Sequence, residues 1–299
     1  MVEDAGPDAL QDHDGSQADM MQERCILVDS SDNRIGSESK LNCHYEDGVL
    51  HRAFSVLLFN AGCELLVQKR SDDKITFPSV WANTCCSHPL DIPGENEDAV
   101  TGVINAAKRK LNQELGIPLQ QLEDIDFQHI GKFQYECRWD QKWVEKEVDH
   151  VIVANVDREK IHIEPNPNEI SEIRWVSPSE TQDIIESTGI WKDELVAPWF
   201  KLLFNEFLVN YLPEFPYPRH DVVHFGEVDM DGNSIVPGQN LLDAIALHRE
   251  HVEKVIMRSL SKMKQEQLHG AMTHLFTGGG KRLRATLPRL VGEAVGEAH

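Results

Sequence analysis

Short runs of apolar and β-branched residues, each bounded by polar turn residues, recur between residue 25 and about residue 211. Runs of this length and composition are typical of β-strands. The predicted strands cover residues 25–29, 51–60, 63–70, 126–137 and 142–156. Helical patterns alternate with them at 96–116, near 178–187 and at 197–212. This mixed order predicts an α+β fold, with helices layered on both faces of a sheet as α/β/α.

The longest helical pattern, residues 96–116, has a clear apolar face. Positions such as Ala99, Val103 and Leu111 repeat at the spacing of helical turns, which is typical of an amphipathic helix. Gly116 and Pro118 follow directly and predict where the helix ends.

The two ends of the chain have a different pattern from its middle. Residues 1–24 are acidic and predict a disordered tail. Residues 212–240 contain four prolines and no sustained period, which predicts a linker. Residues 241–299 show successive helical patterns and predict a short all-α segment that begins a further domain. The layered domain is thereby expected to span residues 25–211.

The composition narrows the class of protein. The 299 residues carry a formal net charge of -21, which argues against nucleic acid as a partner because a phosphate backbone requires a basic face. There is no apolar run long enough to span a membrane and no secretory signal at the N-terminus. Six cysteines without a CxxC pair are then most simply reduced thiols, which predicts a cytoplasmic protein.

The segment NTCCSHPL, residues 83–90, is the first candidate for chemistry. In an extended chain the side chains alternate, so Cys86 and His88 point to one side and Cys85 to the other. Only one of the two cysteines can therefore share a site with the histidine. The alternative is a pair of small buried thiols beside a hydrogen-bonded histidine.

A candidate metal site combines three histidines with two carboxylates. Glu145 and Glu147 are two apart in a predicted strand, so both point the same way. His44 and His51 precede another strand, and each pair alone is a weak indication. Together with His88 they make a set of ligands that suits Mg²⁺, Mn²⁺ or Zn²⁺.

The helix end AAKRKLNQELGI resembles a degenerate Nudix box, in which carboxylates hold a metal on a diphosphate. Glu114 is kept, but Lys110 and Gln113 stand where a Nudix hydrolase has glutamates. Their loss argues against ordinary Nudix hydrolysis, which needs those ligands. Basic residues close to these motifs predict an anion pocket: Lys40, Arg70, Lys74, Arg109 and Lys110.

Residues 25 to about 205 resemble type I isopentenyl-diphosphate delta-isomerases, which have a Nudix fold. The motifs that carry the resemblance are NTCCSHPL, LHRAFSVLLFN, KITFPSVWANT, QELGIP and PWFK. It implies an enzyme that interconverts isopentenyl and dimethylallyl diphosphates. Ser79 stands where many members have glycine. Two other interpretations are a Nudix hydrolase of another diphosphate and a non-catalytic domain that delivers substrate to a prenyl synthase.

The resemblance also implies roles for individual residues. Cys86 and Glu147 are the catalytic pair, with Tyr135 beside Glu147. The implied metal ligands are His44, His51, His88, Glu145 and Glu147. The implied diphosphate contacts are Lys40, Arg70, Lys74 and Lys110, with Glu114 on the Mg²⁺ of the substrate and Trp199 facing the reacting carbons.

The chemistry explains why such residues are required. Moving the double bond adds a proton at C4 and removes one at C2, through a tertiary carbocation that water would trap. The site needs an acid, a base, a dry pocket and an aromatic face. We expect Glu147 with Tyr135 to be the acid and a Cys86 thiolate to be the base.

The C-terminal segment has a resemblance of its own. HLFTGGGKRLRATLPRL is similar to the opening motif of trans-polyprenyl diphosphate synthases, in which Lys281 and Arg282 would contact isopentenyl diphosphate. Ala285 replaces the usual proline, and neither aspartate-rich motif of that family is present. The resemblance implies a fusion of an isomerase with a polyprenyl synthase. The alternative is a helical extension with a chance run of glycines.

Overall fold

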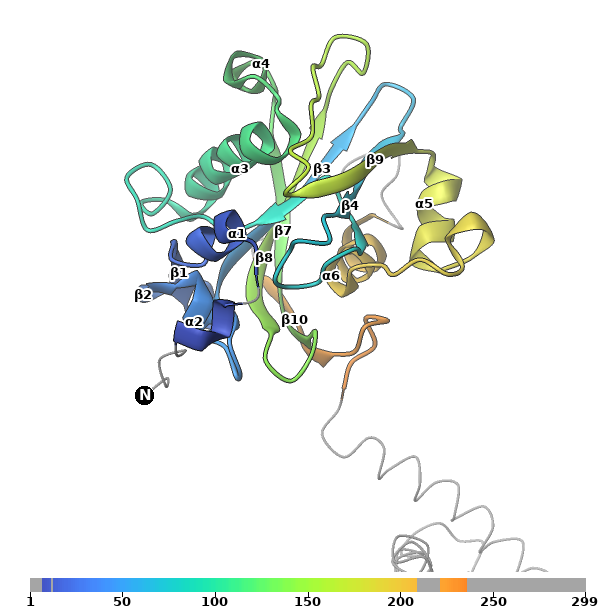
Figure 1. The fold of residues 1–299 in the computed structure, drawn as a ribbon. Helices are drawn as coiled ribbons and strands as arrows, with labels where there is room; N and C mark the ends of the chain where they lie inside the picture. Colours follow the sequence, from blue (N-terminus) through green and yellow to red (C-terminus); the bar gives the residue numbers. More distant parts are fainter. Residues whose placement is uncertain (1–6, 12, 209–220, 236–299) are drawn as a thin grey trace, which may run out of the picture. The chain divides into compact units, whose positions relative to one another are not determined.

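The computed structural model describes residues 7–11, 13–208 and 221–235 (Figure 1). Those up to Ser234 belong to one compact unit. The helical segment predicted for 241–299, with Lys281 and Arg282, lies outside the described residues. Within the described part, no helix combines the length and apolar composition needed to cross a membrane.

A mixed sheet forms the centre of the unit, and its longest path runs β10-β7-β8-β3-β1-β2. The strands are β1 (Arg24–Val28), β2 (Arg34–Ser39), β3 (His51–Phe59), β4 (Leu65–Arg70), β5 (Trp81–Ala82), β6 (Cys85–Ser87), β7 (Gln128–Arg138), β8 (Val144–Asn155), β9 (Ile170–Val176) and β10 (Val222–Val228). Every residue of β3 is buried, because this strand pairs with β8 on one side and with β1, β4 and β6 on the other. All five strands predicted from the sequence are confirmed.

Helices cover both faces of the sheet, as the α+β pattern predicts (Figure 1). They are η1 (Pro7–Leu10), α1 (Gly15–Met20), α2 (Lys40–His44), α3 (Ala99–Leu115), α4 (Leu119–Glu123), α5 (Pro178–Ile185), η2 (Gly189–Trp191), α6 (Pro198–Leu203) and η3 (Phe204–Leu208). One hydrophobic core lies between the sheet and α3, and the other packs α5, α6 and η3 against the opposite face.

Helix α3 has the boundaries that its caps dictate. The Asp98 side chain accepts a hydrogen bond from the Thr101 amide at the first turn. At the other end Gly116 has φ of 65°, a left-handed conformation that glycine adopts without strain. The stop predicted at Gly116 is confirmed.

The prediction of a disordered tail over 1–24 is wrong for the residues that the structure describes. Residues 15–20 form α1, and the Asp14 side chain caps that helix by accepting from the amides of Ser16 and Gln17. Met21 is buried in a small core with Leu41, Ile75 and Trp143. The segment is mostly acidic, but its few apolar residues, such as Met21, pack against the domain and hold the segment in place.

The prediction of a linker over 212–240 is also wrong in part. Residues 222–228 form β10, which pairs in parallel with β7 at the edge of the sheet. Val228 is buried in the core beneath α6, and Lys201 of that helix bonds Asp231 at 2.9 Å. The surrounding prolines suggested a linker, but an edge strand tolerates such neighbours because one of its sides needs no partner. The domain therefore extends beyond residues 25–211 at both ends.

Candidate active site

Strand β6 separates the two adjacent cysteines. Cys85 is fully buried in the core beneath α3, whereas Cys86 and His88 line a pocket on the other side of the sheet. The alternation predicted from the sequence is confirmed. Cys85 donates to the Glu114 carboxylate at 3.5 Å, so its thiol lies away from the pocket.

The register of β3, β8 and β7 places His51, Glu147 and Tyr135 side by side in the sheet. β3 and β8 run parallel with His51 opposite Glu147, and β7 places Tyr135 on the other side of Glu147. The Tyr135 hydroxyl donates to Glu147 Oε2 at 2.8 Å. Cys86 pairs with Ser55, four residues along β3 from His51, so Cys86 and Glu147 flank the same central strand.

A buried cluster brings the predicted metal ligands together. The ligand atoms of His44, His51, His88 and Glu147 all lie within 4.8 Å of one another. Glu145 adjoins this group, with its Oε2 only 2.9 Å from His44 Nε2. The five residues come from α2, β3, β8 and the segment after β6, and the sheet register brings them together.

The hydrogen bonds of the histidines fit a metal ion. Nδ1 of His44 lies 2.8 Å from the Lys40 carbonyl and Nδ1 of His51 lies 2.7 Å from the Val49 carbonyl. Each Nδ1 must then carry the proton, which leaves the Nε2 lone pairs directed into the cluster. Neither Nε2 has a hydrogen-bond partner among the described residues, although carboxylate oxygens lie 2.9 and 3.6 Å away.

The charges of the cluster lead to the same conclusion. Burial disfavours protonation of His51, but the Glu147 carboxylate outweighs it and raises the pKa of His51 to about 9. Burial and the nearby cations lower the pKa of His88. Glu147 thus favours a positive charge beside it, which protonated His51 supplies here and which a divalent ion bound by this donor set would supply in its place.

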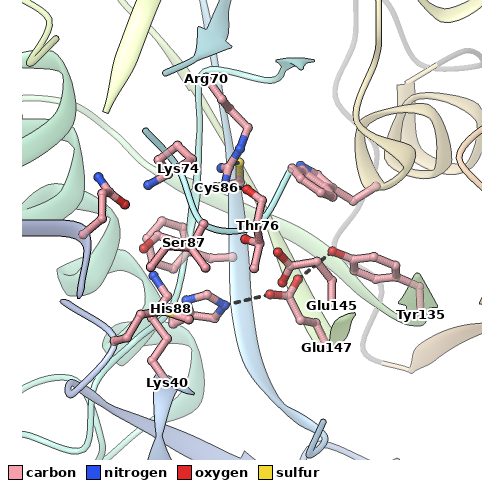
Figure 2. A pocket seen from close by; sticks show the side chains of 15 residues that line it. Lys40, Arg70, Lys74, Thr76, Cys86, Ser87, His88, Tyr135, Glu145 and Glu147 are labelled. Atoms are coloured by element: carbon pink, nitrogen blue, oxygen red, sulfur yellow. Dashed lines mark hydrogen bonds and ion pairs between the residues drawn. The ribbon is translucent and has the colours of Figure 1, made fainter. Parts of the chain in front are cut away.

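Three cations line the other side of the pocket (Figure 2). Lys40 and Lys74 lie opposite Tyr135 and the two glutamates, with Cys86 between the two groups in this view. Arg70 donates to the carbonyls of Phe77 and Thr76, which fixes its guanidinium 3.7 Å from the Cys86 sulfur. The Lys74 ammonium pairs with Glu169.

The described pocket wall leaves out two of the predicted diphosphate and magnesium residues. Lys110 and Glu114 are buried on α3 and bond each other at 3.0 Å. Lys110 also donates to Gln113 at 3.3 Å, so its ammonium bonds two side chains of its own helix. Arg109, another predicted pocket cation, instead pairs with Glu95 and donates to the His88 carbonyl.

The protonation of the catalytic candidates follows from burial. Burial raises the pKa of the Cys86 thiol to about 12, against the opposing effect of Arg70. Burial also raises the pKa of Tyr135. For Glu147, burial is outweighed by His51 and Tyr135, so its pKa is lowered. With no ion bound, these shifts favour a thiol at Cys86, a phenol at Tyr135 and a carboxylate at Glu147, and the acid and base expected from the sequence stay a prediction.

Trp199 closes the apolar side of the pocket. It stands in the first turn of α6 after Pro198, is 3% exposed, and packs against Phe77 with ring centroids 5.2 Å apart. The Arg70 guanidinium lies 5.6 Å from the centre of its ring. This contact shows that the ring face accepts a cation.

Comparisons with known proteins agree with this arrangement. The NUDIX domain family matches residues 49–200, half of the chain. The chain is 40% identical to isopentenyl-diphosphate Delta-isomerase 1 of Mus musculus over 71% of its own length and 95% of that protein. It is 41% identical to the chloroplastic isomerase II of Arabidopsis thaliana, covering 70% of this chain and 74% of that one. The isomerase of Gibberella zeae is 42% identical over 68% and 80% of the two chains.

The chain belongs to the isopentenyl-diphosphate Delta-isomerase family. The region matched by the NUDIX family contains His51, Cys86, Glu147 and Trp199. It begins after Lys40, His44 and helix α1, which therefore lie outside it. In this isomerase sequence, reasoning from motifs missed Gln17, Met21, Thr76 and Ser87, which also line the pocket. Thr76 and Ser87 lie within the motifs KITFPSVWANT and NTCCSHPL and could have been inferred. Gln17 and Met21 could not, because their segment is read as a polar tail.

Proposed function

We infer that the chain interconverts isopentenyl diphosphate and dimethylallyl diphosphate, since its relatives are named isopentenyl-diphosphate Delta-isomerases. One observation carries the inference for this chain. Cys86 and Glu147 face the same pocket, from strands on either side of β3, beside a group of three cations. A proton donor and a proton acceptor next to an anion pocket are what a shift of a double bond in a small diphosphate requires.

In the proposed reaction the cations hold the substrate and the two catalytic groups exchange its protons. Lys40, Arg70 and Lys74 would bind the diphosphate oxygens. One member of the pair adds a proton at C4, which leaves a tertiary cation at C3. The other then removes a proton from C2 to form the new double bond. In the reverse reaction the two roles exchange, so each group acts as acid in one direction and as base in the other.

The directions of these pKa shifts support one assignment of the first roles. Cys86 begins as a thiol and can donate, while Glu147 begins as a carboxylate and can accept. Tyr135 donates to Glu147 and would hold that carboxylate in place. We retain the opposite order, with Glu147 and Tyr135 as acid, as the alternative that the Glu147 variant discussed below tests.

A bound metal ion and the Trp199 ring would assist the proton transfers of Cys86 and Glu147. His44, His51, His88, Glu145 and Glu147 would hold Mg²⁺, Mn²⁺ or Zn²⁺. When bound, such an ion would fix Glu147 and increase the acidity of groups next to it. Trp199 would present its face to the cationic carbons, and its burial would help to keep water away.

A Nudix hydrolase is disfavoured by the state of the box on α3. Lys110 occupies the turn before Glu114 and neutralises it, and Gln113 bonds the sulfur of Met20 at 3.2 Å. A metal ion with several carboxylate ligands has no room in this arrangement, whereas hydrolysis would need one. We keep Glu114 as a proposed ligand of the substrate Mg²⁺ only if Lys110 turns toward the diphosphate.

The test is an assay of the full chain with labelled isopentenyl diphosphate and Mg²⁺. An acid-labile allylic diphosphate is the expected product, and Cys86→Ala is the control that should form none. Released phosphate would instead identify a hydrolase, and unchanged substrate with intact folded protein would identify a non-catalytic domain. Either result would overturn the proposal.

Three further expectations stay predictions. The cytoplasmic location was inferred from the lack of a secretory signal. The fusion with a polyprenyl synthase depends on the motif around Lys281 and Arg282 alone. The identity of the native ion among Mg²⁺, Mn²⁺ and Zn²⁺ requires metal analysis of the purified protein.

A further inference from the structure

The segment that follows β4 has an unusual backbone conformation at Phe77. This residue has φ of 47°, in the left-handed region, and it directly precedes Pro78. Bulky residues rarely adopt such a φ, and a following proline restricts the backbone further toward extended conformations. Phe77 is fully buried, so its neighbours must hold it in this conformation. Backbone strain that the surrounding structure maintains in this way points to a role for the residue.

Arg70 holds this segment through its main chain. The Arg70 side chain donates through Nε to the Phe77 carbonyl and through Nη2 to the Thr76 carbonyl, both at 2.8 Å. The Arg70 amide donates to the Val80 carbonyl at 2.9 Å. The same contacts fix the guanidinium, whose Nη1 lies 3.7 Å from the Cys86 sulfur (Figure 2). The main chain around Phe77 therefore determines where one of the anion-binding groups of the pocket lies.

The ring of Phe77 holds the aromatic side of the pocket. Its centroid lies 5.2 Å from that of Trp199, with the two rings nearly perpendicular at 79°, and 5.2 Å from that of Trp139. Trp199 lines the pocket, and the Phe77 ring packs against it within the same hydrophobic core. A close neighbour at this angle limits rotation of the indole, because a turned Trp199 ring would collide with it.

We propose that Phe77 is a positioning residue that keeps the face of Trp199 directed at the cationic carbons of the reaction. The proposal rests on the isomerase function inferred above. The face of an aromatic ring attracts a cation and its edge does not, so the orientation of the indole determines how much it stabilises the tertiary cation. The left-handed backbone lets Phe77 give its carbonyl to Arg70 and its ring to Trp199. One residue thus fixes the anion-binding group and the aromatic ring relative to each other.

The first test is Phe77→Leu in the full chain, which removes the ring and keeps the carbonyl that bonds Arg70. For isopentenyl diphosphate, kcat should fall about tenfold, which is about 1.4 kcal/mol of transition-state stabilisation. KM should change by less than about threefold, because the anion-binding side chains keep their places. Trp199→Leu should lower kcat further, and adding Phe77→Leu to it should cause no additional loss, since Phe77 acts through Trp199. If Phe77→Leu does not fold, Phe77→Met, which has no ring but fills irregular space, replaces it in each measurement.

Two substrate analogues distinguish this role from a general loss of packing. In dimethylaminoethyl diphosphate a protonated amine stands in the place of C3, whereas isopentyl diphosphate has a neutral carbon there. Calorimetry measures the binding of each analogue directly and without turnover. Phe77→Leu should weaken the binding of the ammonium analogue about tenfold and should change that of the neutral analogue by less than about threefold, because only the cation depends on the ring face.

The matched control is Phe127→Leu, the same substitution at a buried phenylalanine of the core that contains α3. It should keep kcat, KM and the affinity for both analogues, and thermal unfolding establishes that every variant is folded. Unchanged kcat in Phe77→Leu, equal weakening of the two analogues, or independent effects of Phe77→Leu and Trp199→Leu would each overturn the positioning role. Failure of the unmodified chain to isomerise its substrate would refute the proposed function instead, so the two failures are distinguishable.

Discussion

Cys85 and Cys86 are neighbours in the sequence but have opposite surroundings, and this contrast gives the first prediction. Cys86→Ala removes the thiol that faces the pocket and should lower kcat at least about 10²-fold, the usual contribution of a positioned proton-transfer group. Cys85→Ala removes a thiol buried beneath α3 and should keep most of the activity, at a cost of about 1 kcal/mol in stability. Steady-state rates with labelled isopentenyl diphosphate measure both.

The two cysteine variants control for each other because they change the same strand in the same way. Thermal unfolding must show that both are folded before the rates are compared. A similar loss of kcat in the two proteins would contradict the assignment of Cys86, and so would a fully active Cys86→Ala.

Glu147 gives the second prediction because it is assigned two roles, as metal ligand and as a proton-transfer group. Glu147→Gln keeps one coordinating oxygen but removes the charge and the site for a proton. If the residue transfers a proton, kcat should fall on the order of 10²-fold or more and should not recover when metal is added in excess. The measurement is kcat across a metal titration, with the bound ion counted for each protein.

Glu145→Gln is the control for that experiment. It lies two residues along β8 on the same face, 2.9 Å from His44, and is assigned to the metal alone. Its activity should recover as metal is added. Recovery of Glu147→Gln to nearly the original rate would show that the acid or base is another residue, with Tyr135 the next candidate.

Among the helices and strands, those with a long and regular pattern could be predicted from the sequence. Strands β3 and β8 and helix α3 have such patterns and are close to their expected bounds. Because β3 and β8 hold His51 and Glu147, and β3 also pairs with Cys86 of β6, most of the pocket could be predicted as well. The alternation of side chains along a strand is a local rule, so it correctly separated Cys86 from Cys85.

The remaining features depend on contacts that no local pattern contains. Helix α1 has six residues and is held by Asn168, far along the chain, and β10 is ordered by pairing with β7. The inward position of Lys110 follows from its pairing with Glu114, which a motif cannot reveal. Ser79 has φ of 61°, a conformation that glycine adopts more readily, which explains the glycine expected there.

The turn between β1 and β2 gives the third prediction, because it places a buried carboxylate against three strands. Asp32 bonds Arg52 of β3 at 2.7 Å, His150 of β8 at 2.9 Å and Lys132 of β7 at 3.0 Å. Asp32→Asn leaves Arg52 and Lys132 without their counter-charge and should lower the free energy of unfolding by about 3 kcal/mol or more. Urea unfolding at neutral pH measures the change.

The same carboxylate makes stability depend on pH. Burial alone would raise the pKa of Asp32, but His150 and Arg52 outweigh it and lower that pKa below the unfolded value of about 3.9. Its contribution is therefore present above about pH 4 and is lost as the pH falls toward the folded pKa. From pH 5 to pH 3 the unmodified chain should lose more unfolding free energy than Asp32→Asn.

Asp47→Asn, which breaks a surface pair with Arg138, is the control and should leave this dependence unchanged. Equal slopes for the chain and Asp32→Asn would contradict the prediction.

At the scale of the whole chain, β10 moves the C-terminal boundary of the isomerase unit beyond residue 228, so a truncated form should keep this strand. A chain that ends at residue 235 keeps β10 and the bond of Asp231 to Lys201 on α6. One that ends at residue 212 exposes the edge of β7 and part of the core around Val228. We expect the longer form to keep the kcat, KM and melting temperature of the full chain and the shorter one to melt at a lower temperature. Equal melting temperatures would show that β10 adds nothing to the domain.

The last prediction concerns the segment after residue 235, where the motif around Lys281 and Arg282 predicts the opening of a prenyl synthase. Prenyl elongation joins an allylic diphosphate to isopentenyl diphosphate, and the leaving diphosphate needs Mg²⁺ held by carboxylates. The 299 residues contain neither aspartate-rich motif that would hold those ions. The full chain, supplied with isopentenyl and dimethylallyl diphosphates and Mg²⁺, should therefore form no C10 or longer product while it equilibrates the two C5 substrates.

The form ending at residue 235 is the matched control and should give the same products at the same rate. Chain-length analysis of the labelled products decides the matter, since any C10 product made by the full chain and not by the shorter form would show that the segment elongates without those motifs.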